Sequence, residues 1–297
     1  MFDFQKNCIC YIKGGRYPHC HSIFIDDEIR VLIDPACEDT ILKKLSHEKP
    51  IDVIINTHCH EDHFLNNHLF PQAELWAHEK EAPMFRDINA LVDVWLDPEE
   101  NAGPLGEQTR DFLLNDVNYE AREPDRLLLD QETIDFGKTK MQVLHTPGHS
   151  PGHLSFFFPE EKVLFTADLD LVKAGPYYGD RGSDIDDTIH SLKRLLEIEA
   201  DTYLSAHGKY GVYDGDPTYI QQYLDTIYQR ENRLLESLSE NPLTIDQIAN
   251  LGIIYGKREV SGAWDLSLSE KKMMKKHIAR LLRDGKVAQD ADHYVIR

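Results

Sequence analysis

A run of seven residues, Thr-His-Cys-His-Glu-Asp-His at positions 57–63, constrains the fold of this 297-residue chain more than any other segment. It follows residues 51–56, a continuous apolar stretch of the kind that forms a strand buried on both faces. A turn at the end of such a strand brings His58 and His60 together, and Asp62 and His63 then begin the next helix and face the same space. Four metal-type ligands in six residues predict a metal site at the end of this strand.

Three later segments carry the same signature, because each places a potential ligand where a predicted strand ends. His149 lies in Thr-Pro-Gly-His-Ser-Pro-Gly-His at residues 146–153, Asp168 follows a strand at 163–167, and His207 lies in Ser-Ala-His-Gly at 205–208. The small and turn-forming residues beside them let backbone and ion approach closely. The predicted metal ligands are His58, His60, Asp62, His63, His149, Asp168 and His207.

Strands and helices alternate over the first 240 residues, which is typical of an α/β or α+β domain. Strands are predicted at residues 8–12, 22–26, 29–33, 51–56, 141–145, 154–158, 163–167 and 202–205. A helix is expected from about 62 to 70, another begins after Ser183 as its N-cap, and a long one covers about 218–239.

Residues 83–126 interrupt this alternation with a polar, proline-containing segment that has no sustained strand pattern. Such a length without structure is unusual unless it is functional, so a helical insertion or lid is expected. Two interpretations stay open: the insertion shapes the mouth of the active site, or it is a surface elaboration without a catalytic part.

The last 57 residues, 241–297, are predicted to form a separate small domain after a larger domain of residues 1–240. Helices are expected at 244–250 and 269–284, followed by a hairpin of residues 287–289 and 293–296. Helix, helix and hairpin is the element order of a winged helix.

Charge is divided unevenly between these two parts. The formal net charge is -20; residues 241–297 hold ten Lys and Arg against seven Asp and Glu, which is +3 and leaves -23 for residues 1–240. An acidic body argues against a broad phosphate-binding surface. The basic side chains of the longer C-terminal helix are Lys271, Lys272, Lys275, Lys276, Arg280 and Arg283. They indicate either a docking face for nucleic acid or, as we favour, a solvated helix face in a module that packs on the larger domain or on a second subunit.

Neither a membrane span nor a secretory signal is recognisable, so a cytoplasmic protein without membrane contact is expected. Five cysteines, all within the first 59 residues, are expected to be reduced. A third metal site built from Cys8, Cys10 and the His19-Cys20-His21 run lacks paired zinc-knuckle spacing, and buried strand cysteines are favoured instead.

These motifs, in this order, resemble those of the metallo-β-lactamase superfamily over about residues 8–235. The resemblance implies a four-layered αββα sandwich with two metal ions at one edge of its sheets. It also implies a division of the ligands: His58, His60 and His149 hold one ion, Asp62, His63 and His207 hold the other, and Asp168 bridges them. Nitrogen and carboxylate ligands suit Zn²⁺, with Mn²⁺ or Fe as alternatives.

The C-terminal segment resembles the winged-helix tail of a subgroup that includes endoribonuclease-like proteins. That similarity is carried by Leu-Leu-Arg-Asp-Gly-Lys-Val at residues 281–287 and by the element order.

Departures from individual families narrow the expected chemistry. Position 60 is His where flavodiiron proteins have Glu, and position 168 is Asp where the best-known zinc β-lactamases have Cys. Redox chemistry and antibiotic hydrolysis are therefore disfavoured, and the large insertion of β-CASP nucleases is also missing. Phe-Leu-Asn-Asn at residues 64–67 lacks the glycine usual after His63, which weakens any transfer of substrate detail.

The function predicted from these observations is hydrolysis by a hydroxide that bridges two metal ions, on a small ester, thioester or lactone. The resemblance implies that Asp62 also acts as the catalytic proton acceptor. Phosphodiester cleavage in single-stranded RNA, gripped by the C-terminal domain, is the enzymatic alternative, and a non-catalytic metal-binding sensor is the other. A homodimer is a further possibility that the sequence leaves open.

Several conspicuous side chains fall outside the ligand set. His153 is a candidate for orienting the His149 loop by a hydrogen bond, whereas the other remaining histidines are taken as structural. For Tyr177, Tyr178 and Tyr210, aromatic packing is favoured over substrate contact.

Overall fold

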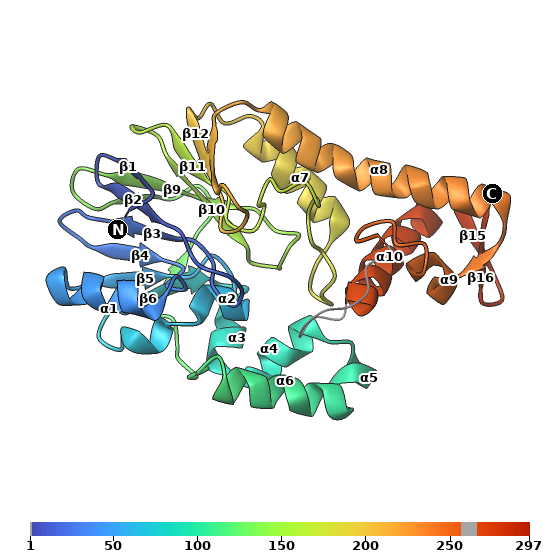
Figure 1. Ribbon diagram of the computed structural model, residues 1–297, viewed down its shortest axis with the longest axis horizontal. Helices are drawn as coiled ribbons and strands as arrows, with labels where there is room; N and C mark the ends of the chain where they lie inside the picture. Colours follow the sequence, from blue (N-terminus) through green and yellow to red (C-terminus); the bar gives the residue numbers. More distant parts are fainter. Residues whose placement is uncertain (1, 257–265) are drawn as a thin grey trace.

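Two mixed β-sheets lie face to face in the computed structural model, which describes residues 2–256 and 266–297 (Figure 1). The first sheet has seven strands in the spatial order β1 to β7, with β4 to β7 parallel to one another. These strands are β1 (Phe4–Lys6), β2 (Ile9–Ile12), β3 (Ser22–Ile25), β4 (Val31–Ile33), β5 (Val53–Ile55), β6 (Glu74–His78) and β7 (Arg126–Leu128).

The second sheet has six strands in the order β13-β12-β11-β10-β9-β8, and only β11 and β12 within it are parallel. Its strands are β8 (Thr133–Asp135), β9 (Lys140–His145), β10 (Leu154–Phe158), β11 (Val163–Phe165), β12 (Thr202–Leu204) and β13 (Val212–Asp214). Every strand predicted from the sequence is present, with ends that differ by at most two residues.

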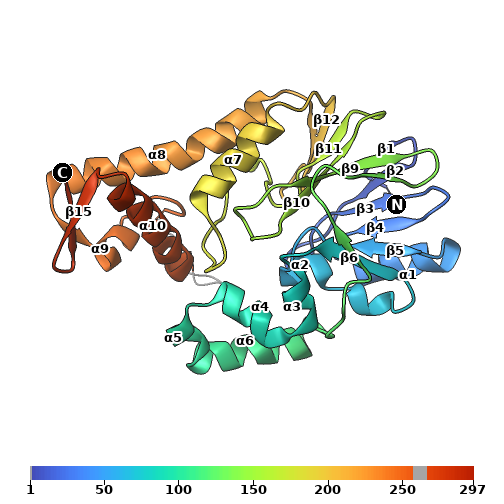
Figure 2. The ribbon, with the colours of Figure 1, turned by 180° about the vertical axis from the view of Figure 1, so that it is seen from behind.

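Helices cover the outer faces of both sheets and complete the four-layered αββα arrangement. Helix α1 (Asp39–Glu48) packs outside the first sheet, and α7 (Ile185–Leu195) and α8 (Thr218–Glu240) pack outside the second (Figures 1 and 2). The predicted cap of α7 was wrong by one residue: the Asp184 carboxylate accepts the Asp187 N–H, while the Ser183 hydroxyl donates to the His149 carbonyl. The fold predicted from the sequence is therefore confirmed.

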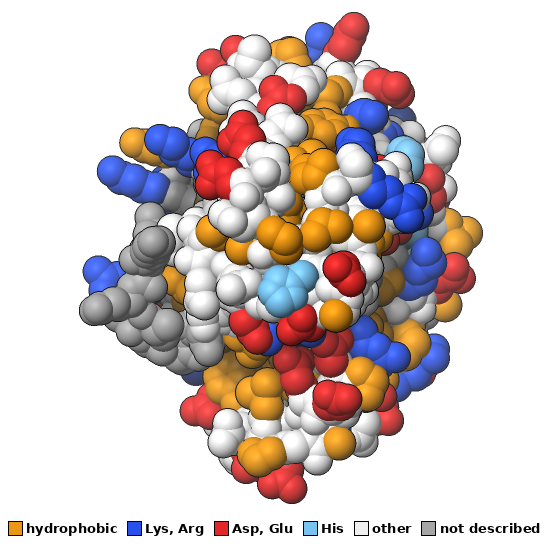
Figure 3. Space-filling view, turned by 90° about the vertical axis from the view of Figure 1, so that its right-hand side faces the viewer, with side chains coloured by type: hydrophobic (Ala, Val, Ile, Leu, Met, Phe, Trp, Pro, Cys, Tyr) orange, Lys and Arg blue, Asp and Glu red, His pale blue; other side chains and the backbone are white. Residues whose placement is uncertain are grey.

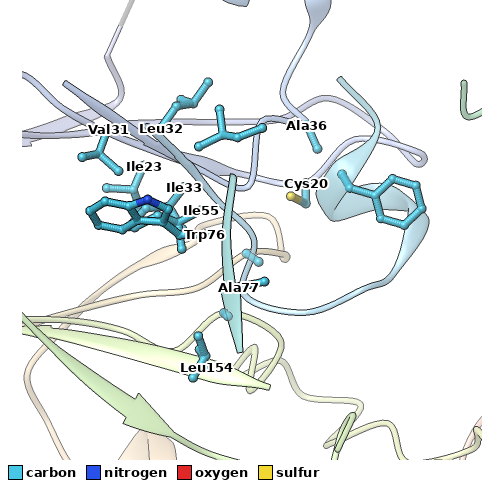
Figure 4. Close-up of a cluster of buried hydrophobic side chains, with 14 of the residues drawn as sticks. Cys20, Ile23, Val31, Leu32, Ile33, Ala36, Ile55, Trp76, Ala77 and Leu154 are labelled. Carbon is cyan, nitrogen blue, oxygen red and sulfur yellow. The ribbon is translucent and has the colours of Figure 1, made fainter. Parts of the chain in front are cut away.

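The core between the sheets is built from the inward side chains of both. Figure 4 shows Ile33, Ile55 and Trp76 on the first sheet, with Leu154 contributed by the second. Burying one such aliphatic or aromatic side chain contributes about 1.5–3 kcal/mol. This rigid core holds the loops that follow β5, β9, β11 and β12 in fixed positions, and those loops carry the predicted ligands.

The stretch after the first motif forms two short pieces rather than one helix, α2 (Glu61–Phe64) and a 3₁₀ turn, η1 (Asn67–Leu69). The insertion is helical, as expected. It comprises α3 (Ala82–Arg86), α4 (Ile88–Trp95), α5 (Pro98–Asn101) and α6 (Pro104–Asn115).

The C-terminal elements are β14 (Leu243–Thr244), α9 (Ile245–Ala249), α10 (Leu266–Arg283), β15 (Val287–Asp290) and β16 (His293–Ile296). Their three strands pair in the order β14-β16-β15. Leu234 and Leu238 of α8 pack with Met274 and Ile278 of α10, so the long helix contributes to this small core as well as to the second sheet. The winged-helix assignment and the boundary after residue 240 stay predictions.

The six basic side chains of α10 all have partners within this chain. Lys271 pairs with Asp246, and Lys272 and Lys275 pair with Glu100 and Asp97 of the insertion. Farther along the helix, Lys276 donates to the Ser183 and Arg181 carbonyls, Arg280 pairs with Asp186 and Glu231, and Arg283 pairs with Asp186. On the face of this domain seen in Figure 3, basic and acidic side chains are interspersed. The helix packs on the first 240 residues, as favoured, but five of its six basic side chains contact those residues instead of forming the solvated face that was expected.

Across residues 2–256 and 266–297, no helix combines the length and the apolar character that a bilayer crossing would require.

Candidate metal centre

Three imidazoles and one carboxylate converge at the ends of β5, β9 and β11. His58 Nε2 lies 3.0 Å from His60 Nδ1 and 3.1 Å from His149 Nε2, and the last two nitrogens are 2.9 Å apart. Asp168 Oδ2 lies 3.4 Å from His149 Nε2 and 3.9 Å from His58 Nε2. At Zn–N distances of about 2.0–2.1 Å, tetrahedral geometry places neighbouring ligand atoms about 3.3 Å apart. This first cluster therefore fits a divalent ion.

A second cluster uses the other oxygen of the same aspartate. Asp168 Oδ1 lies 2.9 Å from His63 Nε2 and 3.3 Å from His207 Nε2. His207 Nε2 is also 3.3 Å from His63 Nε2 and 3.2 Å from Asp62 Oδ2. The structure thus brings together all seven side chains predicted as ligands, in two sets that share Asp168.

Sheet topology explains why these distant residues meet. Strands β4, β5 and β6 run parallel, as do β11 and β12, so their carboxyl ends reach the same edge of the sandwich. Asp168 is directed there by a turn in which Ala167 adopts φ 48°, a left-handed backbone conformation that residues other than glycine seldom take. Gly148 has φ +129°, and a Cβ there would lie 2.3 Å from the Thr188 nitrogen, so glycine is needed where α7 packs against the His149 loop.

Two carboxylates outside the seven ligand side chains orient imidazole rings of the clusters. His60 Nε2 lies 2.7 Å from Asp180 Oδ2, and His63 Nδ1 lies 2.9 Å from Asp34 Oδ2. Asp34 also accepts the backbone N–H and the hydroxyl of Thr57, both at 2.8 Å. Hydrogen bonds of this kind fix which ring nitrogen is left to bind a metal.

The buried carboxylate of Glu81 joins the two loops that carry the first cluster. It accepts hydrogen bonds from the Cys59 N–H at 3.0 Å, the Gly152 N–H at 2.7 Å and the Ser150 hydroxyl at 2.7 Å. One side chain therefore sets the distance between the His58–His60 turn and the His149 loop.

Sequence reasoning missed Asp34, Asp180 and Glu81. Asp34 had a usable signal, because it follows a predicted strand just as the ligands do. Asp180 and Glu81 lie in irregular segments, where no periodicity indicates a side-chain direction.

His153 hydrogen-bonds to the His149 loop, as the sequence predicts, and it also holds the shared aspartate. Its Nε2 accepts the Asp168 backbone N–H at 3.1 Å, and its Nδ1 donates to the Thr146 carbonyl at 3.0 Å. The ring therefore ties the shared aspartate to the start of the His149 loop. His78 and His145, taken as structural, stack on each other with centroids 4.1 Å apart.

The three tyrosines have separate roles. Tyr178 is buried and its hydroxyl contacts Arg230 and His277, as the packing interpretation predicts. Tyr177 lines the cavity beside the first cluster and donates to Asp180 at 2.9 Å. Tyr210 is 64% exposed.

Protonation differs among the histidines of the first cluster. Burial and the neighbouring histidines hold the pKa of His58 well below its usual value, and burial and His60 lower the pKa of His149 to about 4. Burial lowers the pKa of His60, but Asp180 outweighs that effect and raises it to about 9. Burial alone would raise the pKa of Asp168, yet His63 and His207 hold it well below its usual range. Metals bind neutral imidazoles and ionised carboxylates, so His58, His149 and Asp168 are in the forms that bind a metal.

A cavity of about 580 Å³ opens beside the two clusters. His60, Asp62, His149 and Asp168 lie at one end of it, and the insertion and the C-terminal elements supply much of its remaining wall. Of the two interpretations of the insertion, the structure favours the one in which it shapes the mouth of the site.

Comparison with known proteins agrees with this geometry. A sequence profile described as the metallo-beta-lactamase superfamily matches residues 16–207, which contain all seven converging side chains. The chain belongs to the metallo-beta-lactamase superfamily. It is accordingly a hydrolase of that superfamily, with a His/Asp cluster able to hold divalent metal.

Among similar members of the superfamily is a hydroxyacylglutathione hydrolase of Haemophilus influenzae, 30% identical over 65% of this chain and 86% of the relative. An acyl-coenzyme A thioesterase of Gallus gallus is 29% identical over 48% of this chain and 50% of the relative. This chain therefore spans most of the first relative and about half of the second.

A solved structure of a metallo-beta-lactamase family protein from Thermus thermophilus superposes with a TM-score of 0.73. It is 20% identical and covers 97% of this chain and 98% of its own. At that identity the match shows a shared fold, which extends over the C-terminal elements.

Proposed function

We propose that this superfamily member hydrolyses thioesters with two divalent metal ions. In this assignment His58, His60 and His149 hold one ion, Asp62, His63 and His207 hold the other, and Asp168 binds both. The observation that supports it is the convergence of seven side chains in two sets that share one carboxylate and open onto one cavity. Zn²⁺ suits these ligands, with Mn²⁺ or Fe as alternatives.

When bound, such ions supply Lewis acidity and lower the pKa of a coordinated water toward about 7. Hydrolysis then forms a C–O bond to the acyl carbon and breaks its C–S bond, yielding a carboxylic acid and a thiol. Water supplies the oxygen and, in the end, the proton on the sulfur.

The residues of this chain hold and move that proton. Asp62 borders the cavity and lies 3.2 Å from His207, so its carboxylate is the group we assign as proton acceptor. Asp180 and Asp34 keep the His60 and His63 rings in the orientation that binds metal.

Thioesters are preferred over other esters and lactones because two of the similar relatives are described as thioester-cleaving enzymes, a hydroxyacylglutathione hydrolase and an acyl-coenzyme A thioesterase. Cleavage of single-stranded RNA has less support, since the basic side chains of α10 pair with carboxylates and carbonyls of this chain. A non-catalytic metal-binding sensor has no support, because a complete set of ligand side chains lies beside a cavity. The homodimer stays a prediction.

The test is a panel of chromogenic thioester, ester, lactone and bis-phosphodiester substrates offered to metal-loaded protein. We expect the thioester to give the highest kcat/KM. Faster hydrolysis of the phosphodiester, or a salt-sensitive affinity for single-stranded RNA, would contradict the proposal and favour the nuclease alternative.

A further inference from the structure

The cavity beside the metal centre is polar at one end and apolar over most of its wall. Its polar end holds ligands of both clusters together with Glu61, Asp170 and Asp180. The apolar wall includes Trp95, Leu96, Leu105, Phe112, Leu266 and Leu268. A site of this shape orients a ligand that has one reacting polar group and one apolar group.

Two separate parts of the chain supply that apolar wall. Trp95 ends α4 and Phe112 belongs to α6 of the insertion, whereas Leu268 belongs to α10 of the C-terminal domain. The part of the sequence that suggested nucleic-acid docking thus contributes a wall of the cavity beside the metal centre.

Ion pairs hold the two walls together. Lys272 Nζ lies 2.9 Å from Glu100 Oε2, and Lys275 Nζ lies 3.6 Å from Asp97 Oδ2. The ammonium of Lys272 also donates to the Trp95 carbonyl at 3.4 Å. The lysine that borders the cavity is therefore already engaged by a carboxylate, and no other Lys or Arg lines the cavity among the residues that the structure describes.

We propose that the occupant of this space is the apolar acyl chain of a thioester substrate. The acyl carbon lies at the polar end, near His60 and Asp168, and the chain extends between α6 and α10. This inference rests on the proposed thioesterase function and adds the substrate class and the wall that selects it. The volume of about 580 Å³ lies within the range of roughly 300–1,000 Å³ that small-molecule sites span.

Chain length is the property to vary. Each buried methylene is worth up to about fourfold in affinity. With N-acetylcysteamine thioesters from acetyl to decanoyl, the metal-loaded full chain should show kcat/KM rising with length up to the point where the cavity is filled.

Thr109 of α6 allows the cavity to be shortened without touching the metal centre. It lines the cavity, and Thr109→Phe should lower the decanoyl-to-acetyl ratio of kcat/KM at least tenfold. Leu114→Phe is the matched control, because Leu114 lies on the same helix, is 52% exposed and is not among the cavity-lining residues. Leu268→Ala tests the other wall and should reduce the same ratio several-fold, while thermal melts check that each variant folds.

Binding of 1-decanol, measured by calorimetry, separates this inference from the function on which it rests. If no thioester is hydrolysed but 1-decanol binds and Thr109→Phe weakens it, the acyl site stands and the thioesterase proposal falls. If thioesters are cleaved at rates independent of length and of Thr109→Phe, the thioesterase proposal stands and the acyl-chain inference is overturned.

Discussion

Replacing Asp180 by Asn should weaken one metal-binding position and leave the other intact. The Asp180 carboxylate is buried, lies 2.7 Å from His60 Nε2 and accepts the Tyr177 hydroxyl at 2.9 Å. Asp180→Asn keeps the size of the side chain and one acceptor oxygen but removes the negative charge that favours Nε2–H and leaves Nδ1 free for metal. The charge does not reach the second position directly, since His63 is oriented by Asp34 instead.

The magnitude follows from two independent arguments. A hydrogen bond to a charged group contributes about 1.5–3 kcal/mol. Loss of a group that orients a metal ligand typically costs 10- to 100-fold in metal affinity, which is about 1.4–2.7 kcal/mol. We therefore expect one of two metal equivalents to bind 10- to 100-fold more weakly.

Competition with a chromogenic chelator resolves the two equivalents. Asp187→Asn is the control, because Asp187 is an exposed carboxylate on α7 and its loss should change neither equivalent. Asp34→Asn should weaken binding of the other metal equivalent, the one that Asp180→Asn leaves unchanged. Unchanged affinity in Asp180→Asn, or equal weakening of both equivalents, would refute the reasoning.

Two further predictions concern how the site and the C-terminal domain are held. Glu81→Ala leaves three buried donors without an acceptor, those of Cys59, Ser150 and Gly152. The free energy of unfolding, measured by urea titration, should therefore fall by at least about 3 kcal/mol. A loss below about 1 kcal/mol would show that the Glu81 carboxylate is dispensable for holding the two loops together. Burial raises the pKa of Asp186, but Arg283 and Arg280 lower it by more, so its folded pKa lies below the unfolded value of about 3.9. The stabilisation from the Asp186 ion pairs is then present above about pH 4 and is lost as the pH falls through the folded pKa. Urea titrations across about pH 2–6 should show a weaker pH dependence of the free energy of unfolding in Asp186→Asn. An identical pH profile in both proteins would contradict this prediction.

The ligands could be read from the sequence because their positions depend on local signals. His58, His149 and His207 each follow a strand, and strand ends are set by apolar runs and turn residues that one sequence displays. Asp34 follows a strand too, but its role depends on its contact with His63, which requires knowing that β4 lies beside β5.

Other features depend on tertiary contacts that no local pattern encodes. Asp180 reaches His60 from an irregular loop 120 residues away in the sequence. Ser183 looked like a cap but bonds to the His149 carbonyl, so Asp184 caps α7 instead. The basic face of α10 was visible in the sequence, whereas its acidic partners on α5, α7 and α8 became apparent only in the fold.

Metal dependence of hydrolysis tests the central claim most directly. Protein stripped with a chelator should be inactive, and activity should return on adding divalent metal and reach its maximum near two equivalents per chain. His60→Ala should lose both stoichiometric binding and turnover. Full thioester hydrolysis by metal-free protein would contradict the account.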